Sequence, residues 1–225
     1  LLETNGKIIK KIALDIKKFA PKAFVICITN PLDAMVYVLQ KYSKLPKNMC
    51  VGMAGVLDSS RMKYFLSETL QVSIKDVETF VLGGHGDDMV PLVNYTTIGG
   101  IPLMDYIKSK KMPISKIQKI VDRTRMGGGE IVKLLKRGSA FYAPASSAIQ
   151  MAEAFLLNQK KLLPCAAYLN GQYGLKNMYM GVPTIIGSKG IEKIIEVKIS
   201  AKEKSMLKKS VKSVQGLVSA VDKLL

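Results

Sequence analysis

The feature that most constrains this chain is a short, uniformly apolar run that is followed at once by a helical pattern. Residues 24–28 are too few for a helix and too uniformly apolar for a strand with one solvent-exposed face. They therefore predict a buried strand of the parallel type. Asn30-Pro31 ends the run, residues 32–42 show helical spacing, and residues 49–53 form a second short strand candidate. This order of strand, helix and strand predicts an α/β fold with a doubly wound parallel sheet.

The remaining segments add longer helices and a different kind of sheet. Residues 7–19 space isoleucines among lysines at helical intervals, and Pro21 ends that helix. The elements expected beyond residue 56 are helices over 57–70, 114–135, 139–158 and 201–224 (the last with a capping box of Ser200 and Glu203), strands over 77–82 and 90–98, and an antiparallel sheet over 163–197. We therefore expect two regions that meet near residue 55. Residues 1–55 belong to a parallel α/β sheet, and residues 56–225 form an α+β region with an antiparallel sheet and long helices.

The net charge of the chain narrows its possible partners. The chain holds 34 Lys and Arg against 17 Asp and Glu, a net charge of +17, which alone is compatible with nucleic-acid binding. The lysines are dispersed along helical segments, however, only four residues are arginine, and no aromatic residues interrupt the tightest cluster at 108–111. Because nucleic-acid readers favour arginine and stacking aromatics, we predict solvated lysine faces and no nucleic-acid role.

Hydropathy and cysteine usage exclude further classes. No apolar run approaches the ~18 residues of a membrane span, and no signal-peptide pattern opens the chain, so we expect no membrane partner. Cys27, Cys50 and Cys165 are far apart and odd in number, which predicts neither a disulfide framework nor a metal site. A reducing, cytoplasmic environment, or an organelle matrix, is the expected location.

His85 is the only histidine of the chain and lies between Gly84 and Gly86 at the end of a predicted strand. Flanking glycines let the backbone approach a ligand closely and leave the ring unshielded. Histidine is also the side chain best suited to proton transfer near neutral pH. His85 is therefore a candidate general acid and base, and an ordinary exposed loop histidine is the alternative.

Asp58 and Arg61 form a second candidate group. They lie three residues apart on a predicted helix and so share one face. A carboxylate can hold an imidazole in one tautomer, and a guanidinium can bind a substrate carboxylate through two parallel hydrogen bonds. An ordinary surface ion pair explains the spacing equally well.

Two further segments invite a functional interpretation. Asn30 follows the predicted strand 24–28, and ligands of open α/β sheets bind beyond such strand ends, although an Asn before Pro is also common in turns. Gly127-Gly128-Gly129 lacks the spacing and the Lys-Ser/Thr of a phosphate loop. Since these glycines lie within a helical apolar pattern, we predict that they serve close helix packing.

Four segments in a fixed order resemble the lactate/malate dehydrogenase family, in particular the lactate-dehydrogenase-like malate dehydrogenases, over essentially the whole chain. They are Ile28–Asp33 (ITNPLD), Gly52–Arg61 (GMAGVLDSSR), Gly83–Asp87 (GGHGD) with Met89–Pro91, and Gly138–Pro144 (GSAFYAP). The resemblance implies that residues 1–55 are the second half of a Rossmann-type dinucleotide-binding domain and residues 56–225 the catalytic and substrate-binding domain. It also implies NAD as cofactor and a homodimer or homotetramer.

The resemblance assigns roles residue by residue. His85 corresponds to the proton donor and acceptor, Asp58 to the carboxylate that orients it, and Arg61 to the arginine that binds the C1 carboxylate of the substrate. Asn30 corresponds to an asparagine that contacts both substrate and cofactor. Ile28 and Thr29 would line the nicotinamide side, and Asn5 would touch the cofactor. Ala140 stands where lactate dehydrogenases tend to carry threonine, and the smaller side chain leaves room for the second carboxylate of malate or oxaloacetate.

Some parts of the family pattern have no counterpart in these 225 residues. No GxGxxG turn for the pyrophosphate, and no acidic ribose-binding residue after it, precedes residue 30. We expect a family member that has lost its first third, including a mobile loop with two substrate arginines, so that the chain by itself is inactive. The expected function is malate dehydrogenase, an NAD-dependent step of the tricarboxylic acid cycle. A lactate dehydrogenase and a non-catalytic oligomerisation or binding module are the alternatives.

Overall fold

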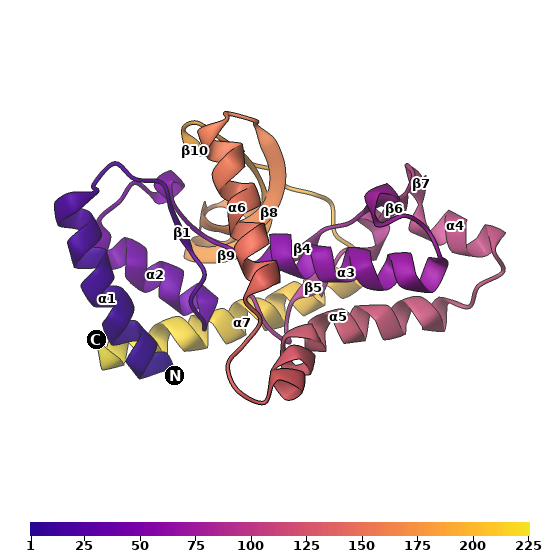
Figure 1. Ribbon diagram of the computed structural model, residues 1–225, viewed down its shortest axis with the longest axis horizontal. Coiled ribbons are helices and arrows are strands. Elements are labelled where there is room, and N and C mark those ends of the chain that lie inside the picture. The colour runs from indigo at the N-terminus through magenta and orange to yellow at the C-terminus, as the bar shows by residue number, and fades with distance from the viewer.

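A five-stranded sheet joins the two halves of the chain (Figure 1). In the computed structural model, which describes residues 1–225, the strand order is β1 (Val25–Cys27), β2 (Cys50–Gly52), β8 (Lys161–Asn170), β9 (Lys176–Gly187) and β10 (Gly190–Ile194). β1 and β2 run parallel, whereas β2–β8, β8–β9 and β9–β10 are antiparallel. The predicted fold class, a remnant of a Rossmann-type parallel sheet followed by an α+β region with an antiparallel sheet and long helices, is confirmed.

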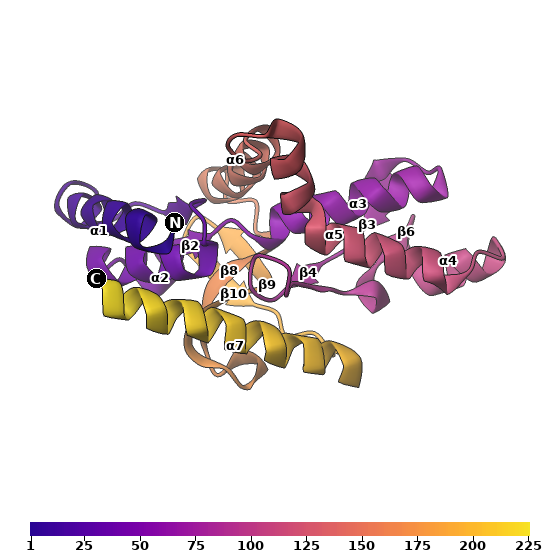
Figure 2. The ribbon, with the colours of Figure 1, turned by 90° about the horizontal axis from the view of Figure 1, so that it is seen from below.

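Three helices form a layer beside the parallel strands. α1 (Leu2–Phe19), α2 (Leu32–Ser43) and the C-terminal half of α7 (Ala201–Leu224) contact one another and enclose an apolar core with the sheet. Figure 2 shows α7 running from this layer past the strands of the main sheet and ending short of α4, which lies at the far end of the molecule. Gly6 permits the close contact of α1 with α7, because a Cβ there would lie 3.2 Å from Val221.

The second half of the chain builds a separate core around two crossing helices. α3 (Gly55–Leu70) packs on α5 (Ile114–Leu135), with α4 (Leu103–Ser109) beside them. α6 (Tyr142–Leu156) contacts α3, β1 and β9 on the face of the sheet opposite α7 (Figure 2). Small sheets complete this half: β3 (Val77–Glu78) with β6 (Thr97–Ile98) and β7 (Ile101–Pro102), and β4 (Val81–Leu82) with β5 (Val90–Pro91).

The sequence-based prediction of two strands was wrong in detail. The single strand predicted over 77–82 is divided at Thr79 between two sheets, and the Thr79 hydroxyl bonds that of Thr96 at 2.7 Å inside the core. The strand predicted over 90–98 is interrupted by a 3-10 helix at Val93–Tyr95. The other predicted elements differ from the structure at their ends only: α1 begins at Leu2, and the last strand ends at Ile194. The helix α4 was not predicted from the sequence. The capping box of Ser200 and Glu203 is confirmed.

The sheet continues across the boundary that we expect near residue 55. Gly52 of β2 pairs with Ala166 of β8, and a Cβ at Gly55 would lie 2.7 Å from Pro164. Both parts therefore share the main sheet of the molecule. The division into residues 1–55 and 56–225 stays a prediction about domain organisation.

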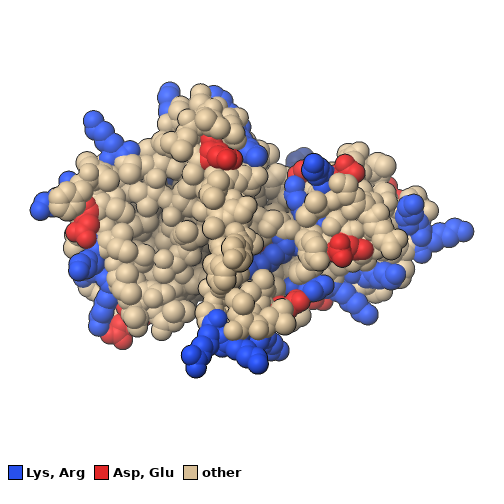
Figure 3. All heavy atoms as spheres, in the orientation of Figure 1, with Lys and Arg blue, Asp and Glu red and all other residues tan.

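In the face seen in Figure 3, lysines and arginines lie mainly around the outline and over the right half, and a broad area in the left half is uncharged. Several exposed apolar residues lie on α1, namely Ile8, Ile12, Leu14 and Phe19. None of the helices combines the length and the apolar character needed to cross a bilayer.

Candidate active site

His85 is carried by a loop that the central sheet holds in place. After β4 the backbone of Gly83 pairs with Gly181 of β9 through two hydrogen bonds, with N to O distances of 2.9 and 3.1 Å. A Cβ at Gly181 would overlap the Gly83 carbonyl, and Gly83 itself has φ +90°. Both glycines are therefore required for the close approach that fixes the start of this loop.

Two helices hold the next residues of the loop. The Gly84 N–H donates to Ser210 Oγ of α7 at 2.8 Å, and the His85 N–H donates to Asp33 Oδ2 of α2 at 2.8 Å. The position of the imidazole is thus set by elements from both ends of the chain.

Asp58 joins the imidazole to the guanidinium. Its Oδ2 lies 2.8 Å from His85 Nδ1, and its Oδ1 accepts a hydrogen bond from Arg61 Nη1 at 3.3 Å. The side chains of Asp58 and Arg61 are 2% and 13% exposed, so this pair is not the ordinary surface ion pair that the sequence left open. The structure brings His85, Asp58 and Arg61 into one buried network.

The network favours a protonated His85. Burial lowers the pKa of His85, but the charge and hydrogen bond of Asp58, with a contribution from Asp33, outweigh burial and raise the pKa above its ordinary value. Because an ionised carboxylate only accepts hydrogen bonds, Nδ1 carries the proton of the neutral ring. The Nε2 atom is therefore free to exchange a proton with a ligand.

The glycine-rich stretch of α5 makes room for Arg61. A Cβ at Gly127 would lie 3.1 Å from Arg61 Cδ, whereas a Cβ at Gly129 would meet nothing within 4 Å. The prediction that these glycines serve close packing is confirmed for Gly127, and the packed group is the candidate substrate-binding arginine.

The residues expected to face the cofactor follow β1. Ile28 is 47% exposed, Thr29 is half-buried, and Asn30 is exposed with no hydrogen bond to its side-chain amide. The Asn5 amide of α1 donates to the Asn30 carbonyl at 2.7 Å. Since β1 and β2 are parallel and β2 leads into α3, these residues and Asp58 follow strand ends on the same edge of the sheet.

Comparison with known proteins decides the family. Residues 55–223 match the model of the lactate/malate dehydrogenase alpha/beta C-terminal domain, and residues 1–52 match the lactate/malate dehydrogenase NAD binding domain. The chain belongs to the lactate/malate dehydrogenase family. Its family, as predicted from the four segments, is confirmed, and members of this family are NAD-dependent 2-hydroxyacid dehydrogenases.

Solved structures of both enzyme types are similar to this dehydrogenase chain. The malate dehydrogenase of Cryptosporidium parvum is 51% identical with a TM-score of 0.98, over 99% of this chain and 71% of that one. The lactate dehydrogenase of the same organism, complexed with lactic acid and NAD, is 45% identical with a TM-score of 0.95, over 97% and 69%. The malate dehydrogenase of Plasmodium falciparum in complex with NADH is 42% identical with a TM-score of 0.96, over 100% and 74%.

The residues after β1 fit the nicotinamide end of the family's cofactor, NAD. The exposed Ile28 offers an apolar surface to a flat ring, and the free Asn30 amide offers both a donor and an acceptor. No GxGxxG turn for the pyrophosphate occurs in residues 1–225. The residues of this chain therefore match the nicotinamide end of NAD, where hydride is transferred, and not its pyrophosphate.

Ala140 is not joined to this group. It lies half-buried in the loop between α5 and α6, and no hydrogen bond connects that loop with His85. It also does not line the recess of about 60 Å³ beside His85. No cluster of His, Cys, Asp or Glu that could hold a metal ion occurs in the structure.

Asp33 is a site residue whose role the sequence analysis missed. It is fully buried, its Oδ2 accepts from the His85 backbone, and its Oδ1 has no hydrogen-bond partner. Burial raises the pKa of Asp33 to about 6, against the opposing hydrogen bond and charge of His85. An acidic residue in an otherwise apolar stretch of α2 is the sequence signal that could have identified it.

Proposed function

We propose that this chain carries the catalytic part of a malate dehydrogenase, which converts malate reversibly to oxaloacetate. The observation that carries the proposal is the buried network of His85, Asp58 and Arg61. In it the Asp58 carboxylate orients both the imidazole that accepts a proton and the guanidinium that binds a carboxylate. We further propose residues 1–55 as the cofactor-binding part and residues 56–225 as the substrate-binding part.

In the proposed reaction His85 Nε2 accepts the proton of the C2 hydroxyl when malate is oxidised. Asp58 holds the ring through Nδ1 and stabilises the imidazolium that forms. Arg61, with one Nη1 bond given to Asp58, keeps its other N–H groups for the C1 carboxylate of the substrate. NAD supplies the hydride acceptor when it is bound. In the reverse direction His85 returns the proton to the developing hydroxyl.

The activity can be tested in a chimera that supplies a complete cofactor site. We propose a fusion of the N-terminal part of the Cryptosporidium parvum malate dehydrogenase with residues 1–225, and we call this fusion the malate dehydrogenase chimera. The structure of the Cryptosporidium enzyme matches residues 1–225 with a TM-score of 0.98. We expect the chimera to oxidise malate, and His85→Asn to reduce kcat by roughly a hundredfold or more, as losses of acid–base groups do. A folded, NAD-binding His85→Asn chimera with undiminished kcat would contradict the proposal.

Residues 1–225 alone are expected to hold NAD weakly, because they contain no pyrophosphate-binding turn. Calorimetry should detect no NAD binding at micromolar concentrations, and steady-state assays should detect no turnover. A micromolar dissociation constant would contradict the expectation of weak binding, and measurable turnover by residues 1–225 alone would contradict the expectation that they are inactive.

The proposed preference for malate over lactate rests on one small residue, Ala140, through its correspondence with the family pattern and not through a contact in the structure. Substituting Ala140→Thr in the chimera should lower kcat/KM for oxaloacetate several-fold more than for pyruvate, because the larger side chain removes space for the second carboxylate. Ser139→Thr is the matched control on the neighbouring residue. Equal effects of Ala140→Thr on both substrates would remove the support that Ala140 gives to malate and would favour the lactate dehydrogenase alternative.

We also propose a homodimer or homotetramer in a reducing, cytoplasmic environment. Exposed apolar side chains on α1 provide surface for self-association. Cys27, Cys50 and Cys165 are all buried free thiols, as a reducing compartment permits. Light scattering coupled to size exclusion measures the oligomeric state, and a monomer at micromolar concentration would contradict this part of the proposal.

A further inference from the structure

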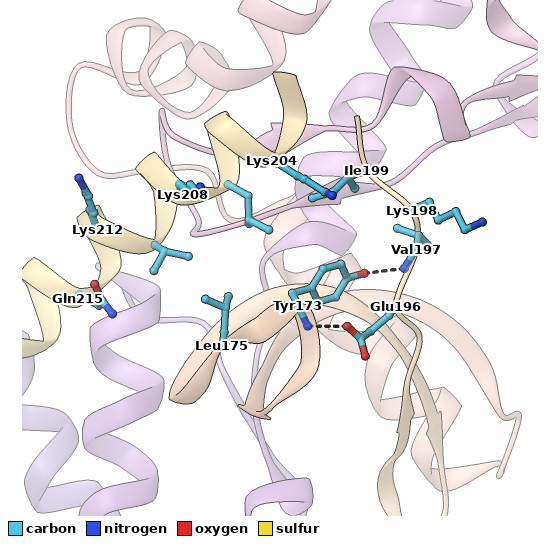
Figure 4. Close-up of a pocket in the computed structure, with 12 residues that line it drawn as sticks. Tyr173, Leu175, Glu196, Val197, Lys198, Ile199, Lys204, Lys208, Lys212 and Gln215 are labelled. Carbon is cyan, nitrogen blue, oxygen red and sulfur yellow. Dashed lines mark hydrogen bonds between the residues drawn. The ribbon is translucent and has the colours of Figure 1, made fainter. Parts of the chain in front are cut away.

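A hollow of about 890 Å³ lies beside the N-terminal half of α7, on the part of that helix remote from both chain ends. α7 forms one wall, and the extended segment 195–200 and the turn after β8 form the other (Figure 4). We call it the α7 groove. None of the candidate active-site residues lines it, so it needs an explanation of its own.

The floor of the groove is apolar. Leu175, Leu207 and Val211 contribute aliphatic side chains, and Leu207 and Val211 are largely buried. The Tyr173 hydroxyl donates to the Ile195 carbonyl at 3.0 Å and accepts from the Val197 N–H at 3.1 Å. These bonds fix the ring and the opposite wall, so the groove exists before any ligand arrives.

The rim contributed by α7 is a row of unpaired lysines. Lys204, Lys208 and Lys212 follow one another at intervals of four residues, about 6 Å along the helix for each step. All three are exposed and make no salt bridge, whereas the neighbouring Lys209 pairs with Asp88 at 2.8 Å. The acidic residue of the groove, Glu196, accepts a hydrogen bond from the Tyr173 N–H and leaves the lysines unneutralised.

We propose that the α7 groove docks an acidic amphipathic helix of a partner protein. The apolar face of such a helix would contact the floor of the groove, and Asp or Glu at every fourth residue would face the lysine row. The spacing matches because residues four apart lie on one face of a helix, in the partner as in α7. The proposal concerns a surface separate from the active site and does not depend on the substrate of the enzyme.

Two other occupants agree less well with the structure. A single phosphate or lipid head group calls for cations that converge on one point, but Figure 4 shows the ends of Lys204 and Lys212 pointing in different directions. A second copy of this chain has no suitable helix, because no helix carries two acidic residues four apart. Its net charge of +17 would also repel the lysine row.

Fluorescence anisotropy with a model peptide tests the proposal on the full chain. The probe is a fluorescein-labelled, lactam-bridged helix with glutamate at every fourth position beside a leucine stripe. The control peptide has the same composition in scrambled order. We expect the ordered peptide to bind at least tenfold more tightly than the scrambled one, because only it presents both faces in register.

Variants locate the binding site. The triple variant Lys204→Ala/Lys208→Ala/Lys212→Ala should weaken binding on the order of tenfold. The matched control, Lys116→Ala/Lys119→Ala/Lys133→Ala on α5, removes the same charge from exposed, unpaired lysines and should change binding less than twofold. Leu175→Ser, at a half-buried floor position, should weaken binding with the lysines intact.

Three results would overturn the proposal. Equal binding of ordered and scrambled peptides would show unspecific charge attraction, and equal losses in the two triple variants would place the peptide elsewhere. Sedimentation with vesicles of anionic lipid that depends on the lysine row, without peptide binding, would identify a membrane surface instead. Circular dichroism of each variant confirms that a loss of binding is not a loss of fold.

Discussion

Asp58 is the residue on which the active site depends, because one carboxylate fixes two groups of different function. Its two oxygens are divided between His85 at 2.8 Å and Arg61 at 3.3 Å, in a position that is 2% exposed. Burial makes these bonds effective, since little water competes for the carboxylate. Removal of Asp58 would therefore leave an unpaired guanidinium and an imidazole with no fixed tautomer.

The raised pKa of Asp33 predicts a pH-dependent stability. The folded state holds the Asp33 proton more tightly than the unfolded state, since the pKa rises from 3.8 to about 6. Its contribution to stability is thus complete below pH ~4 and is lost as the pH rises through about 6. Asp33→Asn mimics the protonated form at every pH. Relative to wild type, the variant should gain up to about 3 kcal/mol between pH ~4 and pH ~8.

Urea unfolding of both proteins across that range provides the measurement. The asparagine amide faces the position where Asp33 Oδ1 has no partner, which adds a cost that does not vary with pH. Only the change with pH is therefore diagnostic. A constant difference between variant and wild type from pH ~4 to pH ~8 would show that Asp33 titrates normally.

At the scale of elements, helices were predicted from the sequence better than strands. The periods of α5 and α7 extend over many residues, so local spacing defines them. β3 and β4 have two residues each and pair with strands that lie further along the chain. Their division at Thr79 follows from pairing with two different strands, β6 and β5, and no local pattern contains these partners. The continuation of β2 into β8 is likewise a long-range pairing.

Two glycine substitutions in α5 test whether the packing of this helix against Arg61 matters for substrate binding. Gly127→Ala should displace Arg61, because its Cβ would lie 3.1 Å from Arg61 Cδ, and should raise the KM of the malate dehydrogenase chimera several-fold. Gly129→Ala enters open space in the same helix and should stabilise the chain by about 0.5–1 kcal/mol without a kinetic effect. Steady-state kinetics and urea midpoints test both, and identical KM values would contradict the steric argument.

At the scale of the whole molecule, the active site is assembled from both halves of the chain. The His85 loop is held by β9, α2 and α7, while its partner Asp58 lies on α3. The sequence alone identified His85, Asp58 and Arg61 as candidates through residue chemistry and family resemblance. It did not identify Asp33, Ser210 or Gly181 as supports, because each acts through a contact between distant segments.

The central claim is that Asp58 holds His85 as a raised-pKa acid and base, and the single histidine makes it directly measurable. Long-range ¹H–¹⁵N NMR of the full chain reports one imidazole, without overlap, through a pH titration. We expect Nδ1 to carry the proton of the neutral ring, a pKa above the ordinary ~6.5, and a lower pKa in Asp58→Asn. A pKa at or below ~6.5 that Asp58→Asn leaves unchanged would contradict the account.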